Sequence, residues 1–259
     1  MQKKEVIIDG VKIAYIEKNT SADTVYVLLH GWGSTSDAFA PFFSRLPSYF
    51  AFDFPGHGAS SPLKTPWTLA DFSRLTKALV EKKLSGKKII YVVHSFGGRV
   101  LLHLLAHFSN TVRPEKIYCI GVPFLREKGL RATVASLLLT PIRFLEKRLP
   151  SRLAKWGKTM WRTFFASADY TALRREVEKK TFSAIVSYHL SPLLPVLTHY
   201  DVVFCWGEND TMAPLSLAKQ AAKQVHAPLY VIPHAGHFPF LGEYEELFFR
   251  IFLPLITQK

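Results

Sequence analysis

Residues 93–98 read Val-His-Ser-Phe-Gly-Gly, and they lie where an apolar run, 88–94, passes into a helical pattern, 96–108. A serine at a sharp turn between a strand and a helix projects its hydroxyl from the edge of the sheet, and the next backbone N–H points to where an oxyanion would form. The N-terminus of the helix adds a favourable dipole for that negative charge. Because an ordinary turn with Ser95 as the helix cap would share this pattern, the motif indicates a nucleophile only if partner residues accompany it.

Two possible partners follow strand-like segments later in the chain. Asp210 ends the sequence Gly-Glu-Asn-Asp after the apolar run 201–206, and His237 lies in Ala-Gly-His-Phe-Pro after the run 228–232. A turn aspartate or a loop histidine is common by itself. Serine, acid and histidine in this chain order, each just past a strand, is the arrangement of α/β hydrolases rather than of other serine hydrolases. The three placements together predict a catalytic triad of Ser95, Asp210 and His237.

The segments around the first motif alternate between strand and helix patterns. Asp9-Gly10 is a strong signal for a two-residue turn, so 5–9 and 11–17 are expected to pair as a hairpin. Since the other strands are apolar on both faces and separated by helices, we expect a mostly parallel eight-stranded sheet flanked by helices. These strands are predicted at 24–29, 49–53, 88–94, 116–122, 201–206 and 228–232, and helices at 36–46, 68–84, 96–108, 214–224 and 243–256.

The alternation stops between residues 124 and 199, where the sequence is helical, basic and rich in aromatic residues. Prolines at 141, 150, 192 and 195 interrupt this segment. We therefore expect an α/β core formed by 1–123 and 200–259, and a helical insertion formed by 124–199.

These motifs resemble those of the α/β-hydrolase family over nearly the whole chain. The sequence His-Gly-Trp-Gly at 30–33 resembles the family's oxyanion loop, which implies that the backbone N–H groups of Trp32 and Phe96 hold the oxyanion. Together with the small size of the chain, it is similar to the capped serine esterases, among them the carboxylesterases that cleave pimeloyl-carrier-protein methyl esters. A serine nucleophile excludes the haloalkane dehalogenase and epoxide hydrolase branches, which use aspartate there.

A second loop, 52–60, resembles the family's loop after the next strand. The resemblance implies structural roles for Asp53, Gly56 and Gly58, and no catalytic role for His57. The motif around the serine departs from the family at Val93, where a glycine is usual. A β-branched residue in so crowded a turn implies local repacking near Gly97.

Other histidines compete for the role of base. His94 adjoins Ser95, but its side chain is expected to point away from the serine, and His30 is expected to tie the oxyanion loop together. His234 is the main rival of His237, whose Gly-His-Phe-Pro context favours it. His103 and His107 have the spacing of a zinc pair, but leucine replaces the glutamate of H-E-x-x-H, so we expect a helix face and no metal.

The resemblance also implies that 124–199 is a cap that roofs the site and selects substrates. Aromatic residues in the cap and near the triad could pack the cap onto the core, but some should line a mostly apolar pocket. We therefore expect an ester of small to medium size and no metal or organic cofactor. The pocket candidates are Trp32, Phe96, Phe124, Trp161, Phe165 and Phe238.

The chain has a net charge of +13, of which +9 lies between residues 124 and 200, where 14 Lys and Arg accompany five Asp and Glu. This charge can be a solvated surface, a contact for an acidic carrier protein or a contact for an anionic surface. Nucleic acid is not expected, because no binding motif accompanies the charge.

The N-terminal segment and the two cysteines bear on the compartment of the protein. No apolar signal-peptide core follows Met1, and Cys119 and Cys205 are expected to be buried free thiols, so we expect a cytoplasmic protein. The predicted activity is carboxylic ester hydrolysis. A thioesterase or carbon–carbon bond hydrolase would use the same triad, and a lyase or ligand receptor on this fold can keep it intact.

Overall fold

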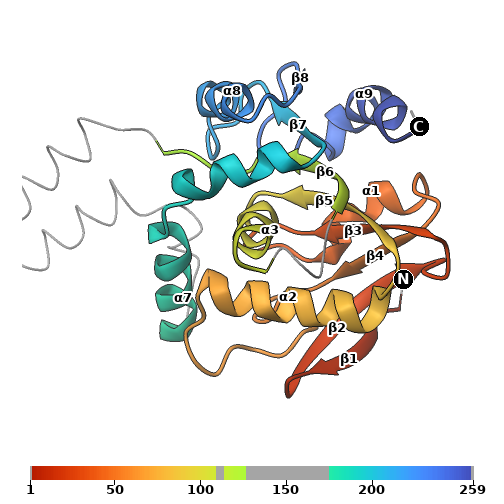
Figure 1. The fold of residues 1–259 in the computed structure, drawn as a ribbon, viewed down its shortest axis with the longest axis vertical. Helices are drawn as coiled ribbons and strands as arrows, with labels where there is room; N and C mark the ends of the chain where they lie inside the picture. Colours follow the sequence, from red (N-terminus) through yellow and green to blue (C-terminus); the bar gives the residue numbers. More distant parts are fainter. Residues whose placement is uncertain (1, 109–113, 127–174, 258–259) are drawn as a thin grey trace, which may run out of the picture.

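Eight strands form one sheet in the order β1-β2-β4-β3-β5-β6-β7-β8 (Figure 1). The computed structural model describes residues 2–108, 114–126 and 175–257. The pairs β1·β2 and β2·β4 are antiparallel, and the other pairs of neighbouring strands are parallel, which confirms the predicted sheet. The strands are β1 (Lys4–Ile8), β2 (Val11–Lys18), β3 (Thr24–Leu29), β4 (Tyr49–Phe52), β5 (Lys88–His94), β6 (Pro114–Ile120), β7 (Val202–Gly207) and β8 (Leu229–Ile232).

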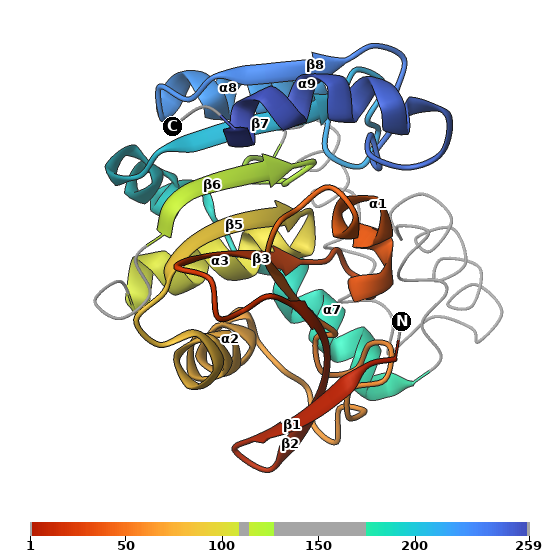
Figure 2. The same cartoon turned by 90° about the vertical axis from the view of Figure 1, so that its right-hand side faces the viewer.

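The hairpin at the edge of the sheet forms at the predicted turn. Asp9 and Gly10 both have positive φ, 48° and 77°, which is the conformation of a two-residue turn that matches the twist of paired strands. The strands leave this turn with Ile8 opposite Val11. In Figure 2 the sheet extends from this hairpin at the bottom to β8 at the top.

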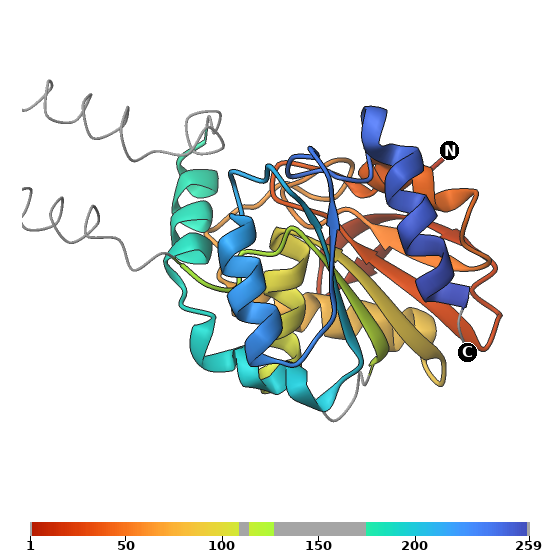
Figure 3. The same cartoon turned by 90° about the horizontal axis from the view of Figure 1, so that it is seen from above.

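Helices cover both faces of the sheet. Figure 3 shows α3 (Phe96–His107) and α8 (Leu215–Gln224) on one side of the strands and α9 (Glu245–Thr257) on the other. The larger buried cluster lies on the face covered by α3 and α8, and it also includes residues of α2 (Leu69–Leu84). The smaller cluster joins α9 to η1 (Ser36–Phe39) and α1 (Ala40–Phe43) on the opposite face. Two cores of this kind are typical of a sheet buried between two helical layers.

Element boundaries differ from the sequence-based prediction by a few residues. The strand expected at 116–122 is β6, which begins at Pro114 and ends at Ile120, because Gly121 has a φ of 57° and turns the chain. The helix expected at 36–46 is the shorter pair η1 and α1. The C-terminal helix begins with the 3₁₀ turn η3 (Gly242–Tyr244).

Two elements between 124 and 199 are described. The helix α7 (Glu176–Ser187) buries Thr181, Phe182 and Ile185, and η2 (Ser191–His199) packs into the larger cluster. Residues 127–174 lie outside the described residues, so the predicted bounds of the helical insertion stay a prediction. In the part of the chain that the structure describes, every helix is too short or too polar to cross a membrane.

Candidate active site

Ser95 occupies a strained turn between β5 and α3. Its φ of 47° and ψ of −110° are unusual for a residue with a side chain, and such strain persists only where the surrounding structure enforces it. The Ser95 N–H donates to the Ile120 carbonyl over 3.0 Å. A Cβ at Gly97 would lie 2.2 Å from the Leu29 carbonyl oxygen, so the first turn of α3 fits only with glycine there. Val93 is fully buried in the larger cluster, and its effect on the turn stays a prediction.

Asp210 and His237 form a buried pair at the ends of β7 and β8. The His237 Nδ1 atom lies 2.8 Å from Asp210 Oδ2. The other oxygen, Oδ1, accepts the backbone N–H groups of Met212 and Ala213 over 2.9 and 2.8 Å. The residues are only 5% and 8% exposed. Because a carboxylate only accepts, Nδ1 carries the proton, which leaves Nε2 of a neutral His237 as an acceptor.

The Asp210–His237 pair and Ser95 both lie close to Gly121. This residue follows Ile120, which accepts the Ser95 N–H. A Cβ on Gly121 would lie 3.2 Å from His237 Cε1 and 3.3 Å from Asp210 Oδ2. The Nε2 atom of His237 is buried, and no hydrogen-bond partner for it is found among the described residues. The three residues predicted as a triad therefore lie together at the carboxyl ends of β5, β7 and β8.

His94 fixes the backbone of the His237 loop, a role that sequence analysis missed. Its Nε2 atom lies 2.9 Å from the His237 carbonyl oxygen, which can only accept. The His94 ring also packs against the rings of His237 and Phe238, at centroid distances of 4.8 and 4.5 Å. Burial, and secondarily the proximity of His237, lower the pKa of His94 to about 3. It therefore stays neutral and positions the candidate base.

His30 ties together the two loops that follow β3 and β4, as expected. The Phe54 N–H donates to His30 Nε2 over 2.9 Å, so the proton of a neutral His30 is on Nδ1 and bonds the Gly31 carbonyl at 2.7 Å. Burial, helped by repulsion from His57, lowers the pKa of His30 to about 3. A Cβ on Gly31 would lie 3.4 Å from Ser95 Cβ. The candidate oxyanion loop thus passes directly beside the candidate nucleophile.

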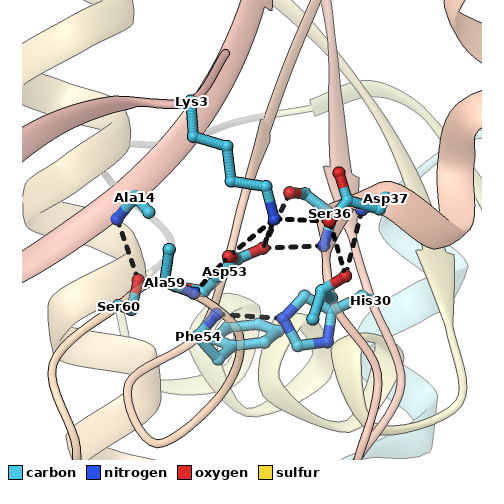
Figure 4. A network of polar contacts seen from close by, with 10 residues as sticks. Lys3, Ala14, His30, Ser36, Asp37, Asp53, Phe54, Ala59 and Ser60 are labelled. Carbon is cyan, nitrogen blue, oxygen red and sulfur yellow. Dashed lines mark hydrogen bonds and ion pairs between the residues drawn. The ribbon is translucent and has the colours of Figure 1, made fainter. Parts of the chain in front are cut away.

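Asp53 holds the same two loops together through a buried ionic network (Figure 4). Its carboxylate accepts the backbone N–H and hydroxyl of Ser36 over 2.8 and 2.7 Å, and the Ala59 N–H over 2.9 Å. Lys3 donates to both Asp53 oxygens, over 3.1 and 2.8 Å, and also to Asp37. Burial raises the pKa of Asp53, but the hydrogen bonds from Lys3, Ala59 and Ser36 outweigh it, so that the pKa lies below its usual value. The expected structural role of Asp53 matches these contacts.

The aromatic pocket candidates have different surroundings. The Trp32 ring packs edge-on against Phe96 at 5.4 Å and also contacts Phe182 of α7 at 5.4 Å. Phe238 is 38% exposed beside His237. Phe124 is buried against Phe204 in the larger cluster. Trp161 and Phe165 lie outside the described residues.

The other histidine and cysteine candidates lie in surroundings that do not include the Asp210 carboxylate. The side chain of His234 is 80% exposed beside Glu208, whereas the histidine bonded to Asp210 is His237. His103 lies 3.1 Å from the Ser73 hydroxyl, and no group of three possible metal ligands occurs among the described residues. Cys119 and Cys205 are buried free thiols, and burial raises the pKa of both.

Several known proteins are similar to this chain. A pimeloyl-[acyl-carrier protein] methyl ester esterase of Xanthomonas oryzae pv. oryzae is 26% identical over 242 residues, which cover 85% of this chain and 90% of that protein. The enzyme of the same name from Chromobacterium violaceum is 27% identical over 252 residues, covering 90% and 94%. The solved esterase EaEST from Exiguobacterium antarcticum matches with a TM-score of 0.70 at 19% identity, covering 96% and 97%, which shows a shared fold.

A family model also matches the chain. The model of the alpha/beta hydrolase family matches residues 26–250, from β3 into α9. This range includes the strained serine turn, both loops that follow β3 and β4, and the paired aspartate and histidine. Since the match spans most of the sequence, the chain belongs to the alpha/beta hydrolase family.

Proposed function

We propose that this protein is a serine hydrolase that cleaves carboxylic esters of small to medium size, with Ser95, Asp210 and His237 as its catalytic triad. The observation that carries the proposal is the buried His237 ring, bonded to Asp210 through Nδ1 and left with an acceptor nitrogen beside the strained Ser95 turn. A buried nitrogen without a hydrogen-bond partner lowers stability. An aspartate–histidine pair with a purely structural role is therefore expected to have both ring nitrogens bonded.

The proposed reaction begins with attack on the ester carbonyl by Ser95 Oγ. His237 Nε2 accepts the hydroxyl proton, and Asp210 stabilises the resulting imidazolium. The backbone N–H groups of Trp32 and Phe96 hold the negative oxygen of the tetrahedral intermediate. The proton then passes from His237 to the leaving alcohol, which leaves an acyl group on Ser95. Water activated by the same histidine attacks the acyl-enzyme and releases the acid and the free serine.

The backbone surroundings support this assignment of roles. Met212 and Ala213 hold Asp210 from one side, so its other oxygen keeps a fixed direction toward His237. His94 fixes the carbonyl of His237 itself. His30 and Asp53 brace the loop that carries Trp32. Preorganised donors and a fixed base lower the barrier, because little reorganisation is needed as charge develops.

An ester fits the apolar surroundings of Ser95 and the names of the relatives. Trp32, Phe96 and Phe238 supply aromatic surface next to the candidate triad. The relatives from Xanthomonas oryzae pv. oryzae and Chromobacterium violaceum are named for a methyl ester carried on an acyl-carrier protein. By analogy, the basic segment 124–200 is proposed to receive an acidic carrier. Reversing the charges of Arg174, Arg175, Lys179 and Lys180 should then slow turnover of a carrier-bound ester but not of a free one, with a loss that shrinks as salt rises.

A panel of p-nitrophenyl esters, together with a fluorophosphonate probe, tests the proposed activity. We expect rapid labelling of Ser95 and faster turnover of acetate to hexanoate than of palmitate. Ser95→Ala should abolish both signals, whereas Ser216→Ala, an exposed serine on α8, should leave both unchanged. Labelling without turnover of any ester or thioester would contradict ester hydrolysis and favour the lyase or receptor alternative.

A further inference from the structure

Arg99 is a buried cation on α3 that no step of the proposed reaction uses. It lies one helical turn after Ser95, whose carbonyl accepts the Arg99 N–H, and the residue is only 6% exposed. Within the described part of the chain, no carboxylate forms an ion pair with it. Burial, and secondarily Arg126, lower the pKa of Arg99 to about 10, so the guanidinium stays charged at neutral pH.

The guanidinium bonds three backbone carbonyls instead of an acid. Nη1 donates to the Pro123 carbonyl over 3.0 Å, and Nη2 donates to those of Ile185 and Tyr188 over 2.7 and 2.9 Å. Ile185 and Tyr188 lie at the C-terminal end of α7, where the helix dipole is negative, and the Ile185 carbonyl also accepts the Tyr188 N–H over 3.3 Å. The planar fork of arginine can serve carbonyls from two segments at once, which a lysine ammonium cannot do in the same geometry.

Pro123 and α7 lie on opposite sides of a long stretch of chain. One buried side chain therefore joins α3, the helix that begins just after the candidate nucleophile, to the segment that follows β6 and to α7. Figure 1 shows α7 beside the end of α3. Buried arginines without an acidic partner are uncommon. A well-packed apolar residue at this place would not satisfy the last carbonyls of α7.

The same helix reaches the loop that carries Trp32. Phe182 of α7 packs against the Trp32 ring at 5.4 Å, and the buried Thr181 hydroxyl accepts the Trp67 N–H over 3.0 Å. Fixing the C-terminal end of α7 thus fixes the aromatic wall formed by Trp32 and Phe182. If the Trp32 N–H holds the ester oxygen, this wall belongs to the same residue that contacts the ester, and it is our candidate for the surface along which an acyl chain bound to Ser95 lies.

We propose that Arg99 is a positioning residue that locks α7 against the Trp32 loop and thereby sets how well the site holds longer acyl chains. The lock itself rests only on the contacts above, and its effect on substrates rests on the proposed function. Arg99 takes no part in the proton transfers.

Hydrogen exchange of the α7 amides tests the lock without reference to activity. We compare the wild type with Arg99→Met, which removes all three donated bonds, and Arg99→Lys, which keeps the charge. Arg250→Met on α9 is the matched control, because Arg250 is exposed on the opposite face. The Met variant should speed exchange in α7 by about tenfold or more while β5 and β6 keep their rates, and the Lys variant should lie between it and the wild type. If the Met variant does not fold, the Lys variant decides.

Ester kinetics test the consequence for substrates. In both Arg99 variants KM for p-nitrophenyl hexanoate should rise about threefold to tenfold, with a smaller rise for acetate and a smaller change in kcat. Unchanged exchange in α7, or equal acceleration throughout the sheet, would overturn the lock. Accelerated exchange in α7 with equal effects on both esters would overturn the role in chain length. A wild type inactive on every ester would refute the proposed function while the exchange result still stands.

Discussion

Two buried aspartates in this molecule have opposite surroundings. Asp53 accepts N–H and O–H donors at every side and faces the cation of Lys3. Asp210 also accepts two backbone donors, but its third partner is His237, which retains a nitrogen with no partner among the described residues. The partners of Asp53 all donate hydrogen bonds to it. Asp210 instead contacts an imidazole, His237, whose second nitrogen can still accept a proton.

The two networks differ in a way that separates a structural acid, Asp53, from a proposed catalytic acid, Asp210. Burial does not distinguish them, since both carboxylates are buried. The distinguishing feature is the group at the end of the network. Lys3 and Ser36 take no part in the proposed reaction, whereas in the proposed triad His237 transfers a proton to and from Ser95. We therefore expect changes at Asp53 to act on stability and changes at Asp210 to act on turnover.

We expect the greatest loss of turnover from Asp210→Asn. The amide can donate to His237 Nδ1 and so favours the tautomer with the proton on Nε2, which cannot accept from Ser95. Ester hydrolysis should fall by about 10⁴-fold, as for a triad held in the wrong tautomer. Steady-state kinetics with p-nitrophenyl acetate measure the loss, and a melting temperature within a few degrees of the wild type shows that the fold persists. Loss by less than tenfold would remove Asp210 from the triad.

Asp53→Asn should lower the free energy of unfolding. Removing this charge leaves Lys3 opposite a neutral amide, and breaking a buried ion pair typically costs about 3–5 kcal/mol of unfolding free energy. The matched control is Asp37→Asn, which removes the exposed partner of the same lysine and should cost less than about 1 kcal/mol. Urea unfolding of both variants gives the comparison. Equal losses of unfolding free energy in the two variants would show that the buried Lys3–Asp53 contact stabilises the fold no more than the exposed Lys3–Asp37 contact.

A smaller effect is expected at His94, which belongs to neither network but bonds the backbone of His237. His94→Ala should lower kcat by about 10- to 100-fold, because a misplaced base costs that much even at a distance from the chemistry. His94→Gln can donate an N–H to the same carbonyl and should recover part of the loss. His103→Gln replaces another buried histidine and serves as the control. Equal losses in the Ala and Gln variants of His94 would contradict a role that rests on the donated bond.

The stability that Asp53 contributes should depend on pH, and this effect is the smallest of the four. The pKa of folded Asp53 lies below its usual value, so its contribution to stability is complete above the pKa of the unfolded chain, about 4, and is lost as pH falls through the folded pKa. The difference in unfolding free energy between wild type and Asp53→Asn should therefore be constant near pH 6–7 and shrink below about pH 4. Urea titrations at a series of pH values measure it. A difference that grows on acidification would have the wrong sign.

Most of the fold follows from patterns local in sequence. The apolar runs became strands, and the Asp9-Gly10 turn formed because both residues adopt positive φ. Asp210 and His237 could be paired from the sequence because each follows a strand at one edge of a parallel sheet. The contacts of Lys3 with Asp53, of His94 with the His237 backbone and of Arg99 with α7 carry no such signal. They join residues far apart in the chain through geometry that only the folded backbone creates.

Trapping the acyl-enzyme would identify the nucleophile. With p-nitrophenyl acetate, rapid mixing should give a burst of p-nitrophenol close to one equivalent per protein, if acylation is faster than deacylation. Acid quenching followed by peptide mass analysis should then find one acetyl group, on Ser95. In His237→Ala the burst and the adduct should both be lost. An adduct on another side chain, or steady turnover in Ser95→Ala, would contradict the assignment of Ser95 as the nucleophile.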